Sequence, residues 1–308
     1  MTKGKHYRHA VCAQNFWQTL TLPSKSRISE FRPISLLNSS VKILTKLLAN
    51  RLQPFITKLV HLNQYGFIKN RSIQDCLAWS FEYLHLCHKS RRELVILKLD
   101  FKKAFDRIEH KVMLEIMKKK KGFGERWISW MKLIFNTGTS SVLLNGTLGK
   151  VFHCKRGVRQ EDPLSPLLFV LATDLLQSVT NMANEQGLLN LPIPLQHYSD
   201  FLILQYADDT LIIMEGCSRQ LFFLKAILNS FVVSTGLKVN FQKSMMVPIN
   251  MTTEKSHHLA ATFGCSTRSL SFTYLGLPLG LTKPKVEEFM PLVNRCERRL
   301  VSTSLFLS

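Results

Sequence analysis

The sequence predicts an α+β fold, because its helical and extended stretches are segregated along the chain and do not alternate strictly. Apolar residues recur at helical spacing over 38–60 and 163–184. Short apolar runs, typical of buried strands, occur at 94–99, 201–204 and 211–214. With 308 residues, the chain is long enough to bury a core in one large domain or two smaller ones.

The first third of the chain is predicted to form two helices and a strand. The helices cover 38–60 and 73–87, where apolar residues return every three or four positions. The run LVILKL at 94–99 is short, apolar and partly β-branched, and it ends at Asp100. It therefore predicts a buried strand with a carboxylate at its carboxyl end.

The middle of the chain is predicted to form helices over 102–121 and 125–135, followed by a hairpin over 140–153. The dipeptide Asn145-Gly146 lies between two apolar runs and is typical of a two-residue hairpin turn. A long helix is expected to follow over 163–184.

The last third is predicted to continue with two strands around Asp208-Asp209 and a helix over 220–233. Residues 237–247 are expected to be largely extended, and the segment 274–278 (YLGLP) to be rich in turns. A basic helix is expected over 284–300.

The chain carries a large surplus of positive charge. It has 41 Lys and Arg residues against 21 Asp and Glu, a formal net charge of +20. A surplus of this size indicates a polyanionic partner, first of all nucleic acid. An acidic membrane surface is a weaker alternative, and packing of the ribosomal-protein kind is a third.

Cysteine usage indicates a reducing compartment. The seven cysteines are scattered, odd in number and without CxxC pairs, which argues against a disulfide framework or a zinc ribbon. The closest approach to a metal cluster is His85-Leu86-Cys87-His88, for which a polar patch on a helix is the default interpretation. No run approaches the ~18 apolar residues that a membrane span needs. Because no apolar region follows the basic N-terminus, we expect a soluble, intracellular protein without a secretory signal.

Three carboxylates are candidates for the chemistry of the protein. Asp100 ends a predicted strand, and Asp208 and Asp209 lie at a tight turn between apolar runs. If the two elements lie side by side, the carboxylates converge and stay ionised together only around a cation. Such ligands suit Mg²⁺, and two ions ~3.5–4 Å apart promote in-line phosphoryl transfer. A solvated Asp-Asp turn is the alternative interpretation.

Seven stretches of the chain carry a more specific signal when they are taken in order. They are FRPISLLNSSVKILTKLLANRL (31–52), NQYGFIKNRSIQD (63–75), LKLDFKKAFDRIEH (97–110), RGVRQEDPLSPLLF (156–169), YADDTLI (206–212), GLKVNFQKS (236–244) and YLGLPLG (274–280). In this order and spacing they resemble the motifs of reverse transcriptases from LINE-type (non-LTR) retrotransposons, particularly plant ones. The resemblance implies a right-hand polymerase, with fingers and an antiparallel-sheet palm over 28–280. A basic lead-in over 1–27 precedes them, and the beginning of a thumb over 281–308 follows.

The resemblance implies an RNA-directed DNA polymerase and assigns its metal site. Asp100 and Asp208 would bind two Mg²⁺ ions, for which Mn²⁺ can substitute, with Asp209 assisting and Phe101 offering its backbone carbonyl. Lys243 matches a lysine near the triphosphate and would donate a proton to the pyrophosphate leaving group. The implied partners are an RNA template, a DNA primer and dNTPs, with an endonuclease supplied by another chain. The family also implies a nuclear location.

Four further positions match substrate-binding residues of the family. Phe105 matches an aromatic residue that packs under the incoming sugar and excludes a 2′-hydroxyl; its alternative is an ordinary core position in a helix. Gln160 matches a contact to the incoming nucleotide or template, and Arg159 beside it would balance phosphate charge. Arg32 matches a fingers arginine that grips the triphosphate. An exposed surface position is the alternative for Arg32 and Lys243.

The chain departs from the family pattern at two places. Glu161 stands where the family usually has glycine, which allows close approach of the backbone to the nucleotide. Its bulk and negative charge are expected to impair activity. The isoleucine-proline-lysine stretch of the family is blurred in LTLPSKSRISE (20–30). Together with the short lead-in and thumb, these departures suggest a fragment or decayed copy of an element.

Two competing functions remain open. A catalytically impaired relic would still bind nucleic acid through its charge of +20, in a salt-sensitive manner. An RNA-templated RNA polymerase or a nucleotide cyclase would use the same palm. Phe105 argues against ribonucleotide substrates, and the fingers motifs argue against a cyclase.

Overall fold

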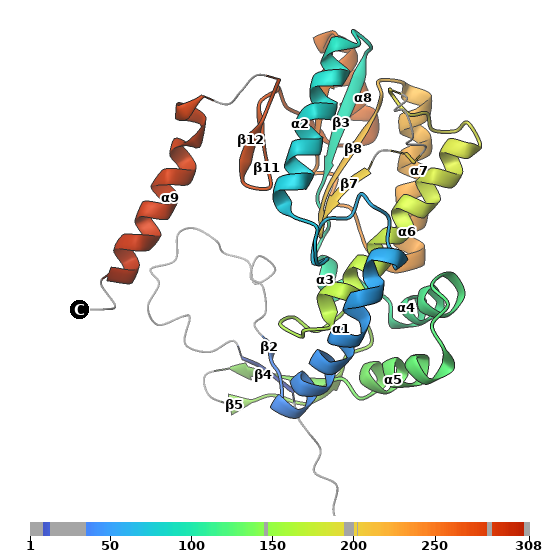
Figure 1. Cartoon of the computed structure of the whole chain (residues 1–308), viewed down its shortest axis with the longest axis vertical. Coiled ribbons are helices and arrows are strands. Elements are labelled where there is room, and N and C mark those ends of the chain that lie inside the picture. The colour runs from blue at the N-terminus through green and yellow to red at the C-terminus, as the bar shows by residue number, and fades with distance from the viewer. Residues whose placement is uncertain are drawn as a thin grey trace, which may run out of the picture. The chain divides into compact units, whose positions relative to one another are not determined.

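The computed structural model confirms the α+β fold class. It describes residues 9–12, 35–144, 147–193, 200–201, 203–281 and 285–304. The chain forms two compact units (Figure 1), each assembled from several segments. Unit 1 consists of Met1–Val60, Lys103–Thr173 and Phe231–Lys238, and unit 2 of His61–Lys102, Asp174–Ser230 and Val239–Ser308.

Unit 2 is built on a five-stranded sheet with the strand order β10-β9-β3-β8-β7. Its strands are β3 (Leu94–Leu99), β7 (Ile203–Tyr206), β8 (Asp209–Glu215), β9 (Met245–Ile249) and β10 (Ser266–Thr267). β3 lies at the centre and pairs antiparallel with both β8 and β9, and β7 pairs antiparallel with β8. The strands predicted around Asp100 and Asp208-Asp209 are therefore confirmed, and they are neighbours in one sheet.

One face of this sheet packs against helix α2 (Ile73–Lys89) and the hairpin of β11 (Phe272–Tyr274) and β12 (Leu277–Leu279). The buried cluster takes alternate residues from each strand, as the period of a strand requires. Its members include Cys76, Tyr83, Leu84, Cys87, Leu94, Ile96, Leu204, Leu211, Ile213, Val247, Ile249 and Tyr274. The YLGLPLG motif is thus part of the core, in addition to forming a turn.

Unit 1 combines several helices with a second sheet. The helices are α1 (Ser39–Leu59), α3 (Ala104–Arg107), α4 (His110–Glu115) with its π-helical extension η2 (Ile116–Lys120), and α5 (Glu125–Asn136). The sheet contains β1 (His9–Cys12), β2 (Ser35–Leu36), β4 (Thr139–Leu144), β5 (Thr147–Leu148) and β6 (Phe152–His153). β4 and β5 form the predicted hairpin, whose turn at 145–146 lies outside the described residues.

The prediction of one helix over 102–121 is wrong, because the chain breaks between α3 and α4 at Ile108 and Glu109. There the Ile108 carbonyl accepts the N–H of Gly157 at 2.7 Å, and the N–H of Glu109 donates to the Thr235 carbonyl at 3.1 Å. These bonds to distant segments replace helical ones. They tie the segment after α3 to the RGVRQ motif and to Thr235, the residue before the GLKVN motif.

The remaining helices are α6 (Ser165–Glu185), α7 (Ser218–Thr235), α8 (Thr253–Phe263) and α9 (Val286–Ser304). Those over 165–185, 218–235 and 286–304 confirm the predicted helices, while α8 was not predicted. The extended structure expected over 237–247 is wrong in part, because residues 241–243 form a turn and β9 begins only at Met245.

Six cysteines are free thiols: Cys76, Cys87, Cys154, Cys217, Cys265 and Cys296. Burial raises the pKa of the Cys76 thiol to about 11 and that of the Cys87 thiol to about 12, as is typical of unreactive core cysteines. Cys87 is fully buried whereas His85 and His88 are exposed, so this tetrapeptide is one turn of α2 with a polar outer face. Among the helices that the structure describes, none has the length and hydrophobicity that crossing a membrane requires.

Candidate active site

The register of β3 and β8 brings Asp100 to the turn that carries Asp208 and Asp209. Leu99 pairs with Thr210, so Asp100 follows the last pair of this ladder. Tyr206 pairs with Asp209, which leaves Ala207 and Asp208 as the turn between β7 and β8. Because neighbouring strands lie about 4.7–4.9 Å apart, these carboxylates, distant in sequence, share one end of the sheet of unit 2.

Asp209 faces the buried side of that sheet. It begins β8 and shares a face with Leu211 and Ile213 of the apolar cluster, because side chains alternate along a strand. Burial raises the pKa of its carboxyl, Lys98 acts in the opposite direction, and the charges of Asp208 and Asp100 raise it further. The charges of Asp208 and Asp100 therefore act on Asp209, and the Lys98 ammonium partly offsets them.

The GLKVNFQKS motif holds Asp100 in place. Val239 forms an isolated bridge with Phe101. Asn240 donates its backbone N–H to the Asp100 carbonyl at 2.7 Å and its Nδ2 to Asp100 Oδ2 at 3.1 Å. Ser244 Oγ accepts the N–H of Asp100 at 3.1 Å. Both Asn240 and Ser244 are buried, so they form a fixed polar shell around the carboxylate.

Sequence reasoning missed Asn240 and Ser244. The available signal was a pair of small polar residues inside a quoted motif, in a stretch expected to be extended. Lys243 lies between them, is exposed, and donates its backbone N–H to the Asn240 carbonyl at 3.0 Å. The chain therefore places Lys243 in the turn that supports Asp100, while its role as a proton donor stays a prediction.

The donor set at this sheet end fits a divalent cation that shares its coordination with a substrate. Within the part of the chain that the structure describes, no group of three or more His, Cys, Asp and Glu residues is placed to hold a metal ion alone. Mg²⁺ usually keeps several waters and binds through one or two carboxylates plus substrate phosphates. Asp100 and Asp208, both half-buried, supply that number of carboxylates. The metal roles of Asp100, Phe101, Asp208 and Asp209 stay predictions.

Phe105 belongs to unit 1, where its ring rests on the core. The ring stacks on that of Phe169 in α6, with centroids 4.6 Å apart and planes inclined by 10°. Phe169 is fully buried, but Phe105 is only half-buried. Its backbone carbonyl accepts the N–H of Val158 at 2.7 Å. Phe105 is therefore a rigid ring supported by the core and not enclosed by it.

Two motif glycines allow the close packing that holds the segment after Phe105. Gly157 and Gly236 adopt left-handed backbone conformations, with φ of +82° and +80°. A Cβ atom on Gly157 would come within 2.8 Å of the Asp106 carbonyl oxygen, and one on Gly236 within 2.3 Å of the Arg107 carbonyl oxygen. Both the conformation and the close approach require glycine.

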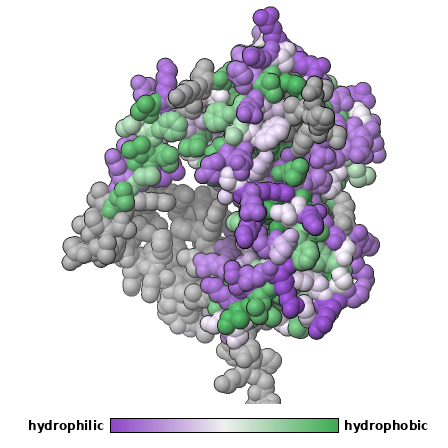
Figure 2. Space-filling view, viewed as in Figure 1, coloured by the Kyte–Doolittle hydropathy of each residue, from purple (hydrophilic) through white to green (hydrophobic). Residues whose placement is uncertain are grey.

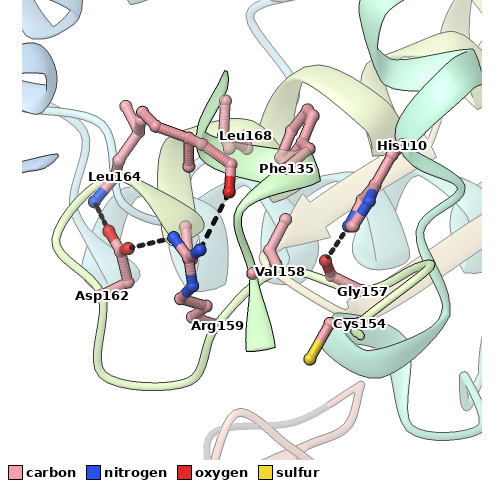
Figure 3. Close-up of a pocket in the computed structure, with 12 residues that line it drawn as sticks. His110, Phe135, Cys154, Gly157, Val158, Arg159, Asp162, Leu164 and Leu168 are labelled. Atoms are coloured by element: carbon pink, nitrogen blue, oxygen red, sulfur yellow. Dashed lines mark hydrogen bonds and ion pairs between the residues drawn. The ribbon is translucent and has the colours of Figure 1, made fainter. Parts of the chain in front are cut away.

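The predicted nucleotide contacts Gln160 and Arg159 are held by neighbouring groups of unit 1. Gln160 Nε2 donates to Asp106 Oδ1 at 3.1 Å. Arg159 donates to the Ile134 carbonyl at 2.9 Å and lies 3.9 Å from Asp162 Oδ2 (Figure 3). Burial lowers the pKa of Arg159 and raises that of Asp162. These contacts give Arg159 a packing role, and its phosphate contact stays a prediction.

Arg159 and Asp162 border a small cavity that His110 and Phe135 help to enclose (Figure 3). His110 stacks on Phe135 at 4.4 Å, and its Nε2 lies 2.7 Å from the Gly157 carbonyl oxygen. The cavity volume of about 30 Å³ admits about two water molecules and no nucleotide. The cavity therefore belongs to the packing behind the RGVRQ segment.

Glu161 is exposed and has a φ of +62°, the left-handed region. This conformation costs an L-residue about 1–2 kcal/mol and costs glycine nothing. The structure thus supplies a backbone reason for the glycine that the family usually carries here, in addition to the bulk and charge considered from the sequence. Arg32 lies outside the described residues.

Residues 22–279 match the family described as reverse transcriptase (RNA-dependent DNA polymerase). The chain belongs to the reverse transcriptase family. It is 29% identical over 225 residues to the "Retrovirus-related Pol polyprotein from type-2 retrotransposable element R2DM" of Drosophila melanogaster, covering 72% of this chain and 20% of the relative. It is 27% identical over 194 residues to the "RNA-directed DNA polymerase from mobile element jockey" of the same species, covering 62% and 20%.

This reverse transcriptase thus spans about a fifth of the length of the two relatives. Among solved structures, telomerase from Candida albicans in complex with a fragment of telomeric RNA has a TM-score of 0.51 at 18% identity, covering 79% of this chain and 36% of that one. This likeness shows a shared fold, and the expected α+β fold of the polymerase type is confirmed. The resemblance to non-LTR retrotransposons is confirmed as well. Its plant-like character stays a prediction.

We expect Glu161→Gly to raise the free energy of unfolding by about 0.5–1 kcal/mol. Relief of the left-handed conformation gains about 1–2 kcal/mol, from which the greater backbone entropy loss of glycine, about 0.5–1 kcal/mol, is subtracted. Urea-induced unfolding near neutral pH measures the difference. Glu161→Ala, which removes the charge and keeps Cβ, is the matched control. Equal stabilisation by alanine would identify the charge as the cause and contradict the backbone explanation.

We expect His110→Gln to make the protein less sensitive to acid. Burial is the largest cause of the lowered pKa of His110, whose ordinary value is 6.5. Its neutral form therefore stabilises the fold above pH 6.5, and this contribution is lost as the pH falls through the lowered pKa. Glutamine does not titrate and retains a donor for the Gly157 carbonyl.

Thermal unfolding between about pH 7.5 and pH 5 tests this difference. The midpoint of the native chain should fall further than that of His110→Gln. His257→Gln, at an exposed position of α8, serves as the control and should follow the native chain. A native-like fall in the His110→Gln protein would contradict the assignment.

Proposed function

We propose that this reverse transcriptase chain is an RNA-directed DNA polymerase domain, which adds dNTPs to a primer 3′-hydroxyl on an RNA template. The observation that carries the proposal is the register that places Asp100 at the turn of Asp208, at one end of a sheet in a chain of this family. Reverse transcriptases use divalent cations, and the two half-buried carboxylates are suited to hold them together with a triphosphate.

The residues of unit 2 divide the work at this sheet end. Asp100 and Asp208 would hold the cations, Phe101 would contribute its main-chain carbonyl and Asp209 would assist. Two bound Mg²⁺ ions, or Mn²⁺ in their place, would activate the primer hydroxyl and neutralise charge on the phosphates. Asn240 fixes the orientation of the Asp100 carboxylate through its bond to Oδ2.

Lys243 protonates the pyrophosphate leaving group. This assignment is supported by its exposed position in the turn that begins at Asn240. The exposed side chain of a lysine in this turn can reach a substrate, while its backbone is held by the hydrogen bond to Asn240, the residue that also binds Asp100.

In unit 1, Phe105 acts as the platform for the sugar of the incoming nucleotide. Its stacking on the buried Phe169 supports this role, because a ring that cannot yield excludes a 2′-hydroxyl sterically. Gln160 contacts the nucleotide or the template, and Arg159 and Arg32 balance phosphate charge.

The template binds on a surface that includes α1. An open groove on unit 1 is lined by Ser39, Lys42, Ile43, Lys46, Leu47 and Pro163. Figure 2 shows hydrophobic side chains gathered over this helix, where Ile43 is 64% exposed and Leu47 57%. Such a surface suits a polynucleotide. The lysines can bind its phosphates, and the exposed apolar side chains can pack against the faces of its bases.

At the level of the whole element, the domain serves a non-LTR retrotransposon in the nucleus. The relatives named after retrotransposable elements support this. Residues 28–280 form the fingers and palm, 281–308 begin the thumb, and a second chain supplies the endonuclease that nicks the target DNA.

A catalytically impaired relic is the second candidate, and Glu161 favours it. The residue combines a left-handed backbone with a negative charge beside Gln160. Such a protein would bind nucleic acid through its net charge of +20 and polymerise weakly or not at all.

We expect Asp208→Ala to lower primer extension by about 100-fold or more, because a metal ligand contributes at least as much as the shell that orients it. The assay uses poly(rA)/oligo(dT), dTTP and Mg²⁺ or Mn²⁺. Glu254→Ala, an exposed carboxylate in α8, is the control and should retain the native rate. Native activity in Asp208→Ala would rule out the metal assignment.

The same assay separates polymerase from relic. We expect weak activity in the native chain and a gain in Glu161→Gly. Salt-sensitive binding to the template without extension in either protein would favour the relic. Extension that does not rise in Glu161→Gly would remove Glu161 as the cause of weak activity.

We expect Phe105→Ala to raise the use of rNTPs relative to dNTPs by about 10–200-fold, the range for discrimination of one small group by a pocket. Single-nucleotide extension with each substrate gives the ratio of kcat/KM values. Phe123→Ala removes another half-buried ring of unit 1, which packs against Trp127, and should leave the ratio unchanged. An unchanged ratio in Phe105→Ala would show that the ring is a core residue only.

A further inference from the structure

The loop of unit 2 that precedes α2 adds a short segment to the edge of the catalytic sheet. Gln64 and Gln205 form a parallel bridge. The N–H of Tyr65 donates to the Gln205 carbonyl at 2.7 Å, and the N–H of Gln205 donates to the Asn63 carbonyl at 2.9 Å. The NQYG motif at 63–66 therefore pairs with β7, the strand that leads into the turn of Asp208.

The side chain of Gln64 reaches the turn itself. Its Oε1 accepts two backbone N–H groups, that of Gly66 at 2.9 Å and that of Ala207 at 3.0 Å. Gln64 is 1% exposed and Ala207 6%, so this hydrogen bond is shielded from bulk solvent. One amide oxygen thus links the NQYG loop to the residue immediately before Asp208.

Ala207 is held in a conformation that an alanine does not adopt freely. Its φ is +57°, in the left-handed region, which persists in L-residues only where the surroundings enforce it. Gly66 packs directly against it, and a Cβ on Gly66 would lie 2.3 Å from the Ala207 nitrogen. Contact on one side and the bond to Gln64 together fix the backbone of the turn.

The loop that carries Gln64 is itself anchored. The N–H of His61 donates to Asp174 Oδ1 at 2.8 Å, and His61 Nδ1 lies 2.7 Å from the same oxygen. Asp174 is 1% exposed. Arg71 Nη1 donates to the carbonyls of His61 and Gln64, both at 2.7 Å. Gln64 is therefore backed by charged groups that leave it little freedom to move.

We propose that Gln64 is a positioning residue for the metal-binding turn: its amide oxygen holds Ala207 left-handed and so sets the direction in which the Asp208 carboxylate leaves the turn. Because Asp208 follows Ala207 directly, a rotation about the Ala207 backbone moves the Asp208 carboxylate relative to Asp100. The inference rests on the proposed function, since the aim of this carboxylate matters only if it holds a catalytic cation.

Three substitutions separate positioning from packing. Gln64→Met keeps the size of the side chain and removes the acceptor, while Gln64→Glu keeps an oxygen in its place. Gln205→Met is the matched control, because it removes a neighbouring buried amide that meets Gln64 Nε2 only at 3.5 Å and whose own Nε2 has no hydrogen-bond partner among the described residues. Gln64→Asn, which withdraws the amide by one methylene, provides a further test if the methionine variant does not fold.

The experiment has two readouts that need no polymerase activity. Amide hydrogen exchange reports on Ala207, and electron paramagnetic resonance measures the Kd for Mn²⁺. In Gln64→Met and Gln64→Asn we expect exchange at Ala207 about tenfold faster or more and a Kd for Mn²⁺ about tenfold higher. Gln64→Glu should lie closer to the native chain, and Gln205→Met should match it.

Native exchange at Ala207 in both acceptor-free variants would overturn the inference. Faster exchange at Ala207 with an unchanged Kd for Mn²⁺ would overturn it as well, because Gln64 would then stabilise the turn without serving the cation. If the native chain binds no Mn²⁺, the proposed function fails, whereas faster exchange at Ala207 in the acceptor-free variants would still show that Gln64 holds the turn. The exchange data therefore separate a failure of the inference from a failure of the proposed function.

Discussion

The antiparallel pairing of β3 with β8 is the constraint on which the candidate active site depends. Both strands are almost wholly buried, so each face of the sheet must receive apolar side chains. Side chains alternate with a period of two, and a slip of one residue would send every side chain to the opposite face. It would also carry Lys98 from the side of Asp209 to the other face. The same register that satisfies the core therefore sets Asp100 beside the turn of Asp208.

The polar residues around this sheet end form hydrogen bonds with main-chain groups that have no partner in the strand pairing. Beyond its last pair, a strand has N–H and C=O groups without partners, and burial makes such groups costly. Ser244 and Asn240 bond to the N–H and carbonyl of Asp100, and Gln64 bonds to the N–H of Ala207. Completing the backbone hydrogen bonding thus also fixes the carboxylates that follow.

The periodicity of apolar residues was sufficient to predict those helices and strands whose structure depends on neighbouring residues in the sequence. The helix from Ser39 to Leu59 and the strand from Leu94 to Leu99 both follow the apolar periodicity of the sequence. α8 was missed because its buried face over Thr253–Phe263 contains few large apolar residues. The break at Ile108 could not be predicted, because the bonds that cause it come from a segment far along the chain.

In the candidate site, too, some features could be predicted from the sequence, while others depend on contacts with distant segments. Resemblance of motifs singled out Asp100 and Asp208, and the sheet register explains why they belong together. The supporting roles of Asn240 and Gln64 depend on partners more than a hundred positions away, which no local pattern encodes. The left-handed backbone of Glu161 was signalled only by the glycine that the family usually has there, and its conformational meaning required the structure.

The net charge of the protein is positive, whereas the carboxylates of the candidate site are negative. A net charge of +20 attracts polyanions over the surface as a whole. At the sheet end, however, the coupled carboxylates of Asp100, Asp208 and Asp209 would repel a triphosphate. Lys98 offsets part of this charge on the side of Asp209. Under the proposed function, divalent cations between a triphosphate and these carboxylates would offset this repulsion, so each ligand would increase the affinity for the other.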